Sequence, residues 1–197
     1  AWFGTVSTLA TMFLVIPVVT KISEKIGKRK AFVVATLLSI VGYVLKWWGF
    51  DPGNPWLMFM PIPFLSFGIG GLFTLMMSMT ADVCDLDELN NGERREGMFG
   101  AVYWWMVKLG TALAMFTSGV VLQLVGFDES ITVQSAETLT NLRLADIIIP
   151  IIAALIAIIL VWRYNITEER AHEIKEALVK RRAEIEIEDK NNRKGAS

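Results

Sequence analysis

Residues 147–162 read IIIPIIAALIAIILVW, a run with no charged side chain. A bilayer core about 30 Å thick is crossed by a helix of roughly 20 apolar residues, because no backbone polar group can stay unpaired in hydrocarbon. A soluble five-helix bundle is the alternative, but its helices each need a polar face, and this run has none. The stretch therefore predicts a membrane-spanning helix.

Four other stretches are also long apolar runs with few or no charged residues. The chain of 197 residues holds 19 Lys and Arg and 20 Asp and Glu, yet these charges are nearly excluded from the apolar stretches and crowd between them. We expect five spans, at residues 2–20, 31–48, 56–81, 98–127 and 147–162. The predicted fold class is thus an all-α, polytopic transmembrane helix bundle over residues 1–166, with a partly helical tail over residues 167–197.

Basic residues gather in alternate connections between these spans. Residues 21–30, 82–96 and the segment after Arg163 carry most of them, whereas the other side has only Lys46 and Arg143. Cytoplasmic loops of membrane proteins carry the excess of Lys and Arg. We therefore expect a multi-pass protein of the cell inner membrane, in contact with lipid, with a cytoplasmic C-terminus.

Composition excludes several other classes of protein. The net charge of −1 gives no sign of nucleic-acid binding. A single cysteine, Cys84, and a single histidine, His172, suggest neither a disulfide framework nor a metal site. We see no nucleophile–base pair and no phosphate-binding Gly loop, so we expect no catalytic residues, no cofactor and no enzyme.

The spans differ in polarity, which predicts where each lies in the bundle. Residues 56–81 are rich in Gly, Ser and Thr, and residues 98–127 carry a stripe of Gly110, Ala114 and Ser118. Small residues allow helices to approach closely. We expect these two spans to be inner helices and residues 147–162 to face lipid.

Lys108 is the most informative residue, because it lies ten residues into a span. A lysine at this depth costs at least about 2.5–3.5 kcal/mol unless it meets water or a counter-charge. Snorkelling to the headgroups is the alternative, but about 15 Å of helix separates Lys108 from the start of the span. Trp104 lies one turn earlier on the same face, where an aromatic ring suits sugar binding or plain helix packing.

Charged residues also flank the cytoplasmic ends of the third and fourth spans. Asp82 and Asp85 share a helical face, and Arg94, Arg95 and Glu96 follow the next turn. Ion pairs between such groups could close a cytoplasmic gate, at about 0–1 kcal/mol for each exposed pair. A solvated loop is the alternative.

The tail from Thr167 has the pattern of a helix. Thr167 can cap it, and Ala171, Ile174, Leu178 and Ile185 make a thin apolar stripe. Such a helix could lie on the membrane or on another domain, although the charge content favours a solvated tail.

One segment resembles a known family. The run Ala81-Asp82-Val83-Cys84-Asp85, then Asn91-Gly92-Glu93-Arg94-Arg95-Glu96-Gly97-Met98-Phe99 and Lys108-Leu109-Gly110, is similar to the signature of the glycoside–pentoside–hexuronide:cation symporters, a branch of the major facilitator superfamily. Gly27-Lys28-Arg29-Lys30 also resembles the basic loop of that superfamily. Leu86 stands where the family commonly has an aromatic residue.

The resemblance implies a partial C-terminal half of a major facilitator superfamily fold, helices eight to twelve of twelve. The chain begins inside an apolar run, so we expect the N-terminal half of the same chain to be missing, together with most of the Na+ or H+ coupling site. The resemblance places Lys108, Trp104, Phe73 and Thr111 at the substrate. Lys28 and Arg29 join the gate residues named above.

Three functions remain open at this point. The first is cation-coupled symport of a sugar or glycoside by alternating access. The second is a related carrier for a lipid or another amphipathic solute. The third is a membrane scaffold subunit without transport activity, against which the interior lysine and the Gly/Ser/Thr-rich span argue.

Overall fold

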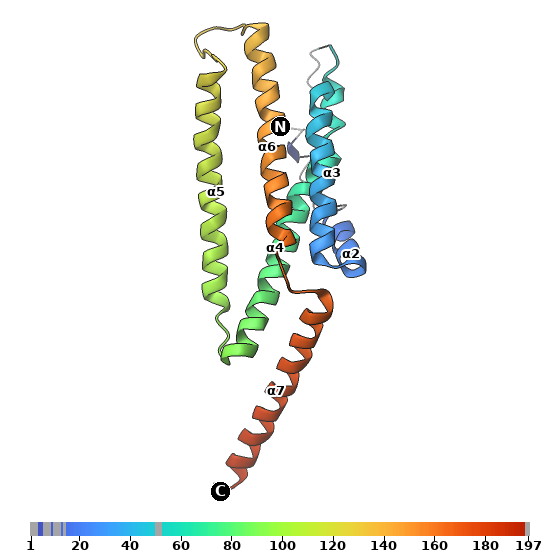
Figure 1. Cartoon of the computed structure of the whole chain (residues 1–197), viewed down its shortest axis with the longest axis vertical. Helices are drawn as coiled ribbons and strands as arrows, with labels where there is room; N and C mark the ends of the chain where they lie inside the picture. The colour runs from blue at the N-terminus through green and yellow to red at the C-terminus, as the bar shows by residue number, and fades with distance from the viewer. Residues whose placement is uncertain (1–3, 6–8, 10–12, 14, 50–52, 196–197) are drawn as a thin grey trace.

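The computed structural model describes residues 4–5, 9, 13, 15–49 and 53–195, and over these residues the chain is helical without strands. The elements are α2 (Ile16–Ile26), α3 (Lys28–Gly49), the 3-10 helix η2 (Pro55–Phe59), α4 (Ile62–Asn91), α5 (Glu96–Leu124), α6 (Ala136–Trp162) and α7 (Glu168–Gly195), as Figure 1 shows. Four described segments are long and apolar enough to cross a membrane: Lys28–Gly49, Trp56–Asn91, Glu96–Leu124 and Ala136–Trp162. The predicted all-α membrane bundle is confirmed.

The helices differ in length from the expected spans. Residues 2–20 are described only in part, as residues 4–5, 9, 13 and 15–20, so that span stays a prediction. α4 runs on to Asn91, well past the apolar stretch, and carries its acidic residues on helix. α6 begins at Ala136, inside the polar connection, because the Ser135 hydroxyl caps it by accepting a hydrogen bond from the Thr138 amide at 3.0 Å.

Two glycines make the turns at one end of the bundle. Gly27, between α2 and α3, has a φ of 83°, and Gly92, after α4, has a φ of 79°. Side chains other than glycine rarely adopt this backbone region, so the turns depend on the missing Cβ atoms.

α4 is the central helix and packs against α2, α3, α5 and α7. Its crossing with α3 is close because small residues meet there. A Cβ atom built on Gly71 would lie 2.6 Å from the Ala35 Cβ, and one built on Gly68 would collide with Ser39. This contact makes α3 and α4 the best-packed pair of helices.

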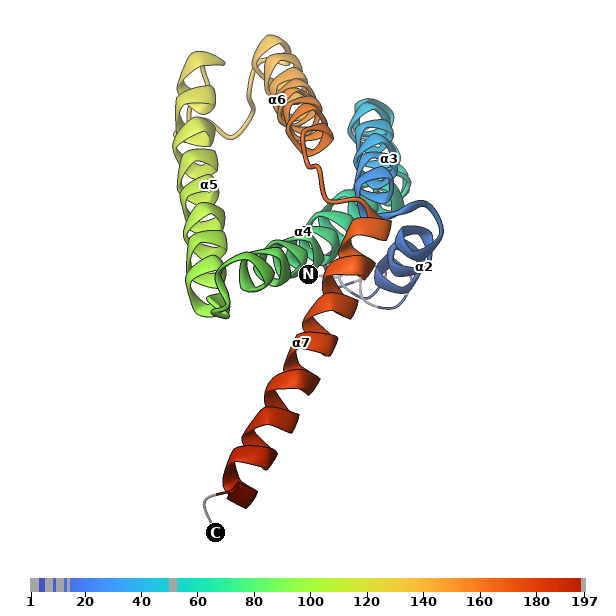
Figure 2. The ribbon, with the colours of Figure 1, turned by 60° about the horizontal axis from the view of Figure 1, so that its bottom comes forward.

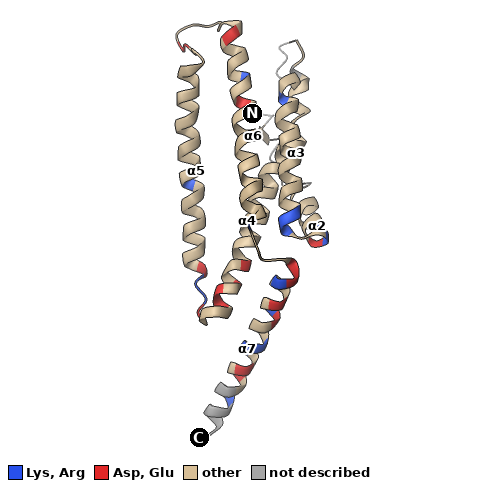
Figure 3. Ribbon diagram, in the orientation of Figure 1, with Lys and Arg blue, Asp and Glu red and all other residues tan. Residues whose placement is uncertain are grey.

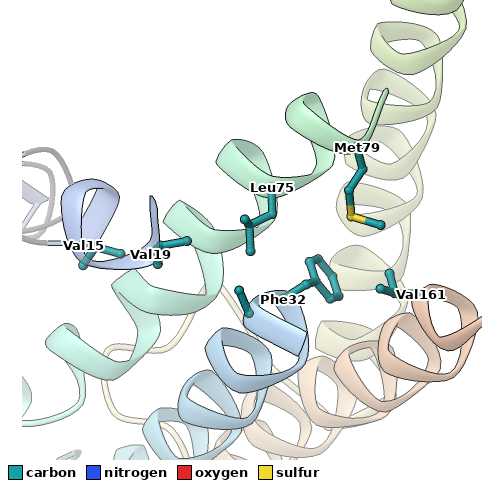
Figure 4. Close-up of a cluster of buried hydrophobic side chains, with 7 residues drawn as sticks. Val15, Val19, Phe32, Leu75, Met79 and Val161 are labelled. Atoms are coloured by element: carbon teal, nitrogen blue, oxygen red, sulfur yellow. The ribbon is translucent and has the colours of Figure 1, made fainter. Parts of the chain in front are cut away.

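A hydrophobic cluster joins α2, α3, α4 and the end of α6. Val19, Phe32 and Leu75 are almost completely buried, and Met79 and Val161 pack beside them (Figure 4). The cluster lies toward the end of the bundle from which α7 leaves, so it positions the α4 and α6 ends that carry charged groups.

The position of α5 as an inner helix, predicted from its small residues, is not tested by this part of the chain. α5 buries none of its residues and contacts only α4 and α6 appreciably, standing away from α3 in Figures 1 and 2. A Cβ atom on Gly110 would meet nothing within 4 Å. Within the described part of the chain, no helix covers the Gly110, Ala114 and Ser118 stripe.

Charged residues concentrate at one end of the molecule. Figure 3 shows charged residues at the start of α3, the end of α4, the start of α5 and the coloured part of α7, all at the same end. We call this the charged end. The opposite end holds η2 and the connection between α5 and α6.

Candidate functional site

Asp82 is the buried centre of an ion-pair network at the charged end. Its carboxylate is only 3% exposed, although it lies on the last third of α4. The Lys28 ammonium, at the start of α3, donates to its Oδ2 at 2.5 Å, and the Lys175 ammonium of α7 lies 3.5 Å from Oδ1. A carboxylate at this depth needs such partners, because an unpaired buried charge is costly.

Arg94 and Arg95, in the turn between α4 and α5, form further ion pairs at the same end. The Arg94 guanidinium donates to Asp85 at 3.3 Å and to Glu88 and Glu96 at 2.9 Å each. Arg95 donates to Asp87 at 2.5 Å. Hydrogen bonding to Glu96 first and to Glu88 next raises the pKa of Arg94, and the bond to Asp87 raises that of Arg95.

Tyr164, just past the end of α6, joins the network from a third helix. Its hydroxyl lies 3.5 Å from the Asp82 Oδ2 and 3.5 Å from the Met79 carbonyl oxygen, and the Arg29 guanidinium donates to its backbone carbonyl at 3.4 Å. Burial, and then the charge of Asp82, raises the pKa of Tyr164. The phenol therefore stays protonated and can donate to the carboxylate.

The structure thus brings together all seven of the residues proposed as a gate, at one end of the bundle. We call the full set the charged-end network: Lys28, Arg29, Asp82, Asp85, Asp87, Glu88, Arg94, Arg95, Glu96, Tyr164, Lys175 and Arg182. Whether it opens and closes as a gate stays a prediction.

Sequence reasoning missed the contribution of α7. Arg182 donates to Glu88 at 2.6 Å, and Ala171, Ile174 and Leu178 are buried, so the tail helix is not simply solvated. Ile174 and Leu178 are one turn apart on a single face, and that stripe was the available signal. What it packs against, α4, could not be read from the sequence.

A cavity of about 310 Å³ lies between α3, α4 and α6. Mainly apolar side chains line it, with Thr36, Ser39 and Tyr43 as the polar ones. Phe73, one of the proposed substrate residues, belongs to this lining. No residue of α5 takes part.

The other three proposed substrate residues lie on α5. Lys108, Trp104 and Thr111 are all exposed, and the Thr111 hydroxyl donates to the Val107 carbonyl at 2.9 Å. Within the described residues, no carboxylate lies in ion-pair distance of Lys108. The structure therefore does not join these three to Phe73, and their role at a substrate stays a prediction.

The sequence profile of the MFS/sugar transport protein family matches residues 1–168. The chain belongs to this family. The resemblance carried by residues 81–110 is thereby confirmed, and the family consists of transport proteins rather than enzymes.

Several relatives of the chain are named as symporters or carriers. It is 35% identical to an uncharacterized symporter of Synechocystis sp. over 66% of this chain and 25% of the relative. It is 27% identical to a glucuronide carrier protein homolog of Escherichia coli over 80% of this chain and 34% of the relative. It is 24% identical to an uncharacterized symporter of Bacillus subtilis over 86% of this chain and 36% of the relative. The chain thus spans about a quarter to a third of the length of these relatives.

Proposed function

We propose that this chain forms part of a secondary active transporter that carries a sugar or glycoside together with Na+ or H+ by alternating access. Membership of the MFS/sugar transport protein family supports transport, and relatives named symporters support coupling. A relative named a glucuronide carrier protein homolog supports a sugar-derived substrate. The N-terminal half and most of the cation site would be supplied by the remainder of a longer protein.

The observation that carries the proposal is Lys108 on an apolar helix. α5 buries nothing within the described chain, yet it carries an ammonium with no carboxylate near it and a tryptophan one turn away. Holding a lysine in hydrocarbon costs about 2.5–3.5 kcal/mol or more. A polar cavity between α5 and the rest of the transporter removes this cost, and the ammonium and indole would then face the substrate.

The charged-end network suits the cytoplasmic gate of such a carrier. It joins α3, α4, α6 and the turn before α5, and most of its pairs are exposed. Exposed pairs are worth about 0–1 kcal/mol each, so a conformational change can break them. We place this end in the cytoplasm of a cell whose inner membrane holds the protein, because the basic residues gather there.

The test is uptake by the full-length transporter in membrane vesicles. We expect sugar uptake that depends on a Na+ or proton gradient and falls by about a hundredfold or more in Lys108→Ala, because a charged partner of the substrate is lost. Leu124→Ala, at the exposed end of the same helix, is the matched control and should transport normally.

Two results would contradict the proposal. Normal gradient-driven uptake by Lys108→Ala would remove the substrate role of that lysine. Uptake of lysolipids in place of sugars would favour a carrier of amphipathic solutes, for which the mainly apolar cavity between α3, α4 and α6 would be the natural site.

A further inference from the structure

α7 is attached to the end of α4 by apolar contacts as well as by charges. Ile174 is 1% exposed, Leu178 4% and Ala171 5%, all on the face of α7 that packs on α4. Burying an aliphatic side chain contributes about 1.5–3 kcal/mol. The contact between α7 and α4 is therefore a packed hydrophobic interface rather than an ion pair between a solvated tail and α4.

The charged contacts of α7 fall on carboxylates that the gate residues also use. Glu88 accepts from Arg94 at 2.9 Å and from Arg182 at 2.6 Å. Asp82 is shared in the same way between Lys28 and Lys175. A change in one cation's position thus alters the field at the carboxylate that the other one binds.

α7 also contacts the turn between α4 and α5. The Arg181 guanidinium donates to the Leu89 carbonyl at 3.4 Å, and a Cβ atom on Gly92 would lie 3.0 Å from its Nη2. Only Glu93 separates Gly92 from Arg94 and Arg95. The tail helix therefore supports the backbone from which both gate arginines extend.

We propose that α7 is a latch that holds the charged-end network in the arrangement seen here. Docking of its apolar face places Lys175 and Arg182 on Asp82 and Glu88 and fixes the last turns of α4 beside Lys28 and Arg94. Release of α7 frees these carboxylates and loosens the turn at Gly92, so the state of the tail controls the gate. Anything that binds or modifies α7 would thereby change the rate of transport.

The first test compares two substitutions on the same helix of the full-length protein. Ile174→Asp places a carboxylate in the buried face, whereas Ile185→Asp places one at a position that is 57% exposed. We expect amide hydrogen exchange over residues 83–91 and 171–182 to become at least about tenfold faster in Ile174→Asp, because local opening is easier. Ile185→Asp should exchange like the wild type.

The second test removes charge without disturbing the apolar contact. Arg182→Gln deletes the bonds to Glu88, and Lys180→Gln removes an exposed cation of the same helix as the control. Cys84, on α4 and 3% exposed, reports the opening of this end through its rate of maleimide labelling, measured on the peptide that contains it. We expect labelling about fivefold faster in Arg182→Gln and no change in Lys180→Gln.

These readouts separate the latch from the proposed function. Exchange and labelling need no substrate, whereas the effect on sugar uptake, expected to fall about fivefold in Ile174→Asp, rests on the proposed function. Unchanged exchange over residues 83–91 in Ile174→Asp would overturn the latch. Fast exchange with an unchanged uptake rate would overturn its control of the gate. Absence of sugar uptake in the wild type would contradict the transport proposal alone.

Discussion

At the scale of single residues, Asp82 differs from the other acids of the charged end. Its carboxylate is almost completely buried, whereas the guanidinium groups of Arg94 and Arg95 that serve the other acids are more than 40% exposed. Losing one partner of a buried pair leaves an uncompensated charge, and this costs far more than losing an exposed pair. The Lys28–Asp82 pair should therefore dominate the stability of this end.

We expect Lys28→Met to destabilise the protein by about 2–4 kcal/mol, because Asp82 then keeps only the more distant Lys175 and the Tyr164 hydroxyl. Thermal unfolding of the detergent-purified protein measures the change. Arg95→Gln, which breaks an exposed pair, is the control and should cost less than about 1 kcal/mol. In the double variant Lys28→Met/Asp82→Asn much of the loss should return, and a strictly additive loss would argue against the pair.

At the scale of helices, the crossing of α3 and α4 depends on glycines. The atom that a Gly71→Ala substitution adds would meet the Ala35 Cβ, which cannot move without its backbone. α5 offers the opposite case, since an added Cβ on Gly119 would meet nothing within 4 Å. Replacing glycine by alanine should therefore lower the stability of the protein on α4 and keep or raise it on α5.

We expect Gly71→Ala to cost about 1–2 kcal/mol, because the overpacking at the crossing outweighs the gain in helix propensity. Gly119→Ala should be neutral or stabilising by up to about 1 kcal/mol. Both are measured as midpoints of thermal unfolding in one detergent. Equal effects of the two substitutions would mean that the α3–α4 crossing is looser than the structure shows.

At the scale of the whole molecule, all the strongly basic connections lie at one end. The turn after α2, the turn after α4 and the tail helix are together there, and the connection from α5 to α6 is at the other end (Figure 3). A membrane protein keeps such a basic end in the cytoplasm. The orientation proposed above rests on this charge asymmetry and can be tested without knowledge of the substrate.

Reporter fusions to the full-length protein test this orientation. Alkaline phosphatase fused after residue 195 should be inactive and green fluorescent protein at the same place should fluoresce, because that site is expected in the cytoplasm. Alkaline phosphatase inserted between residues 128 and 135, at the opposite end, should be active. The reverse pattern would contradict the proposed orientation and the cytoplasmic position of the gate.

The sequence by itself predicted the membrane bundle and seven residues of the charged-end network, but not the contribution of α7. An apolar run such as residues 147–162 predicts a membrane span from the sequence alone, because each side chain has its own free energy of transfer into lipid. The motif from Asp82 to Lys108 likewise indicated the family without any coordinates. Five charged residues of that quoted motif, Asp82, Asp85, Arg94, Arg95 and Glu96, then proved to form ion pairs at the charged end.

Only the tertiary structure decided which groups meet. It alone showed that Lys175 and Arg182 of the tail share carboxylates with Lys28 and Arg94, and that α5 is left uncovered within this chain. The Lys28–Asp82 and Arg182–Glu88 contacts join residues 54 and 94 positions apart. An amphipathic stripe predicts that a helix packs against something, but not against which element. The choice of partner depends on how whole helices pack, which no local pattern contains.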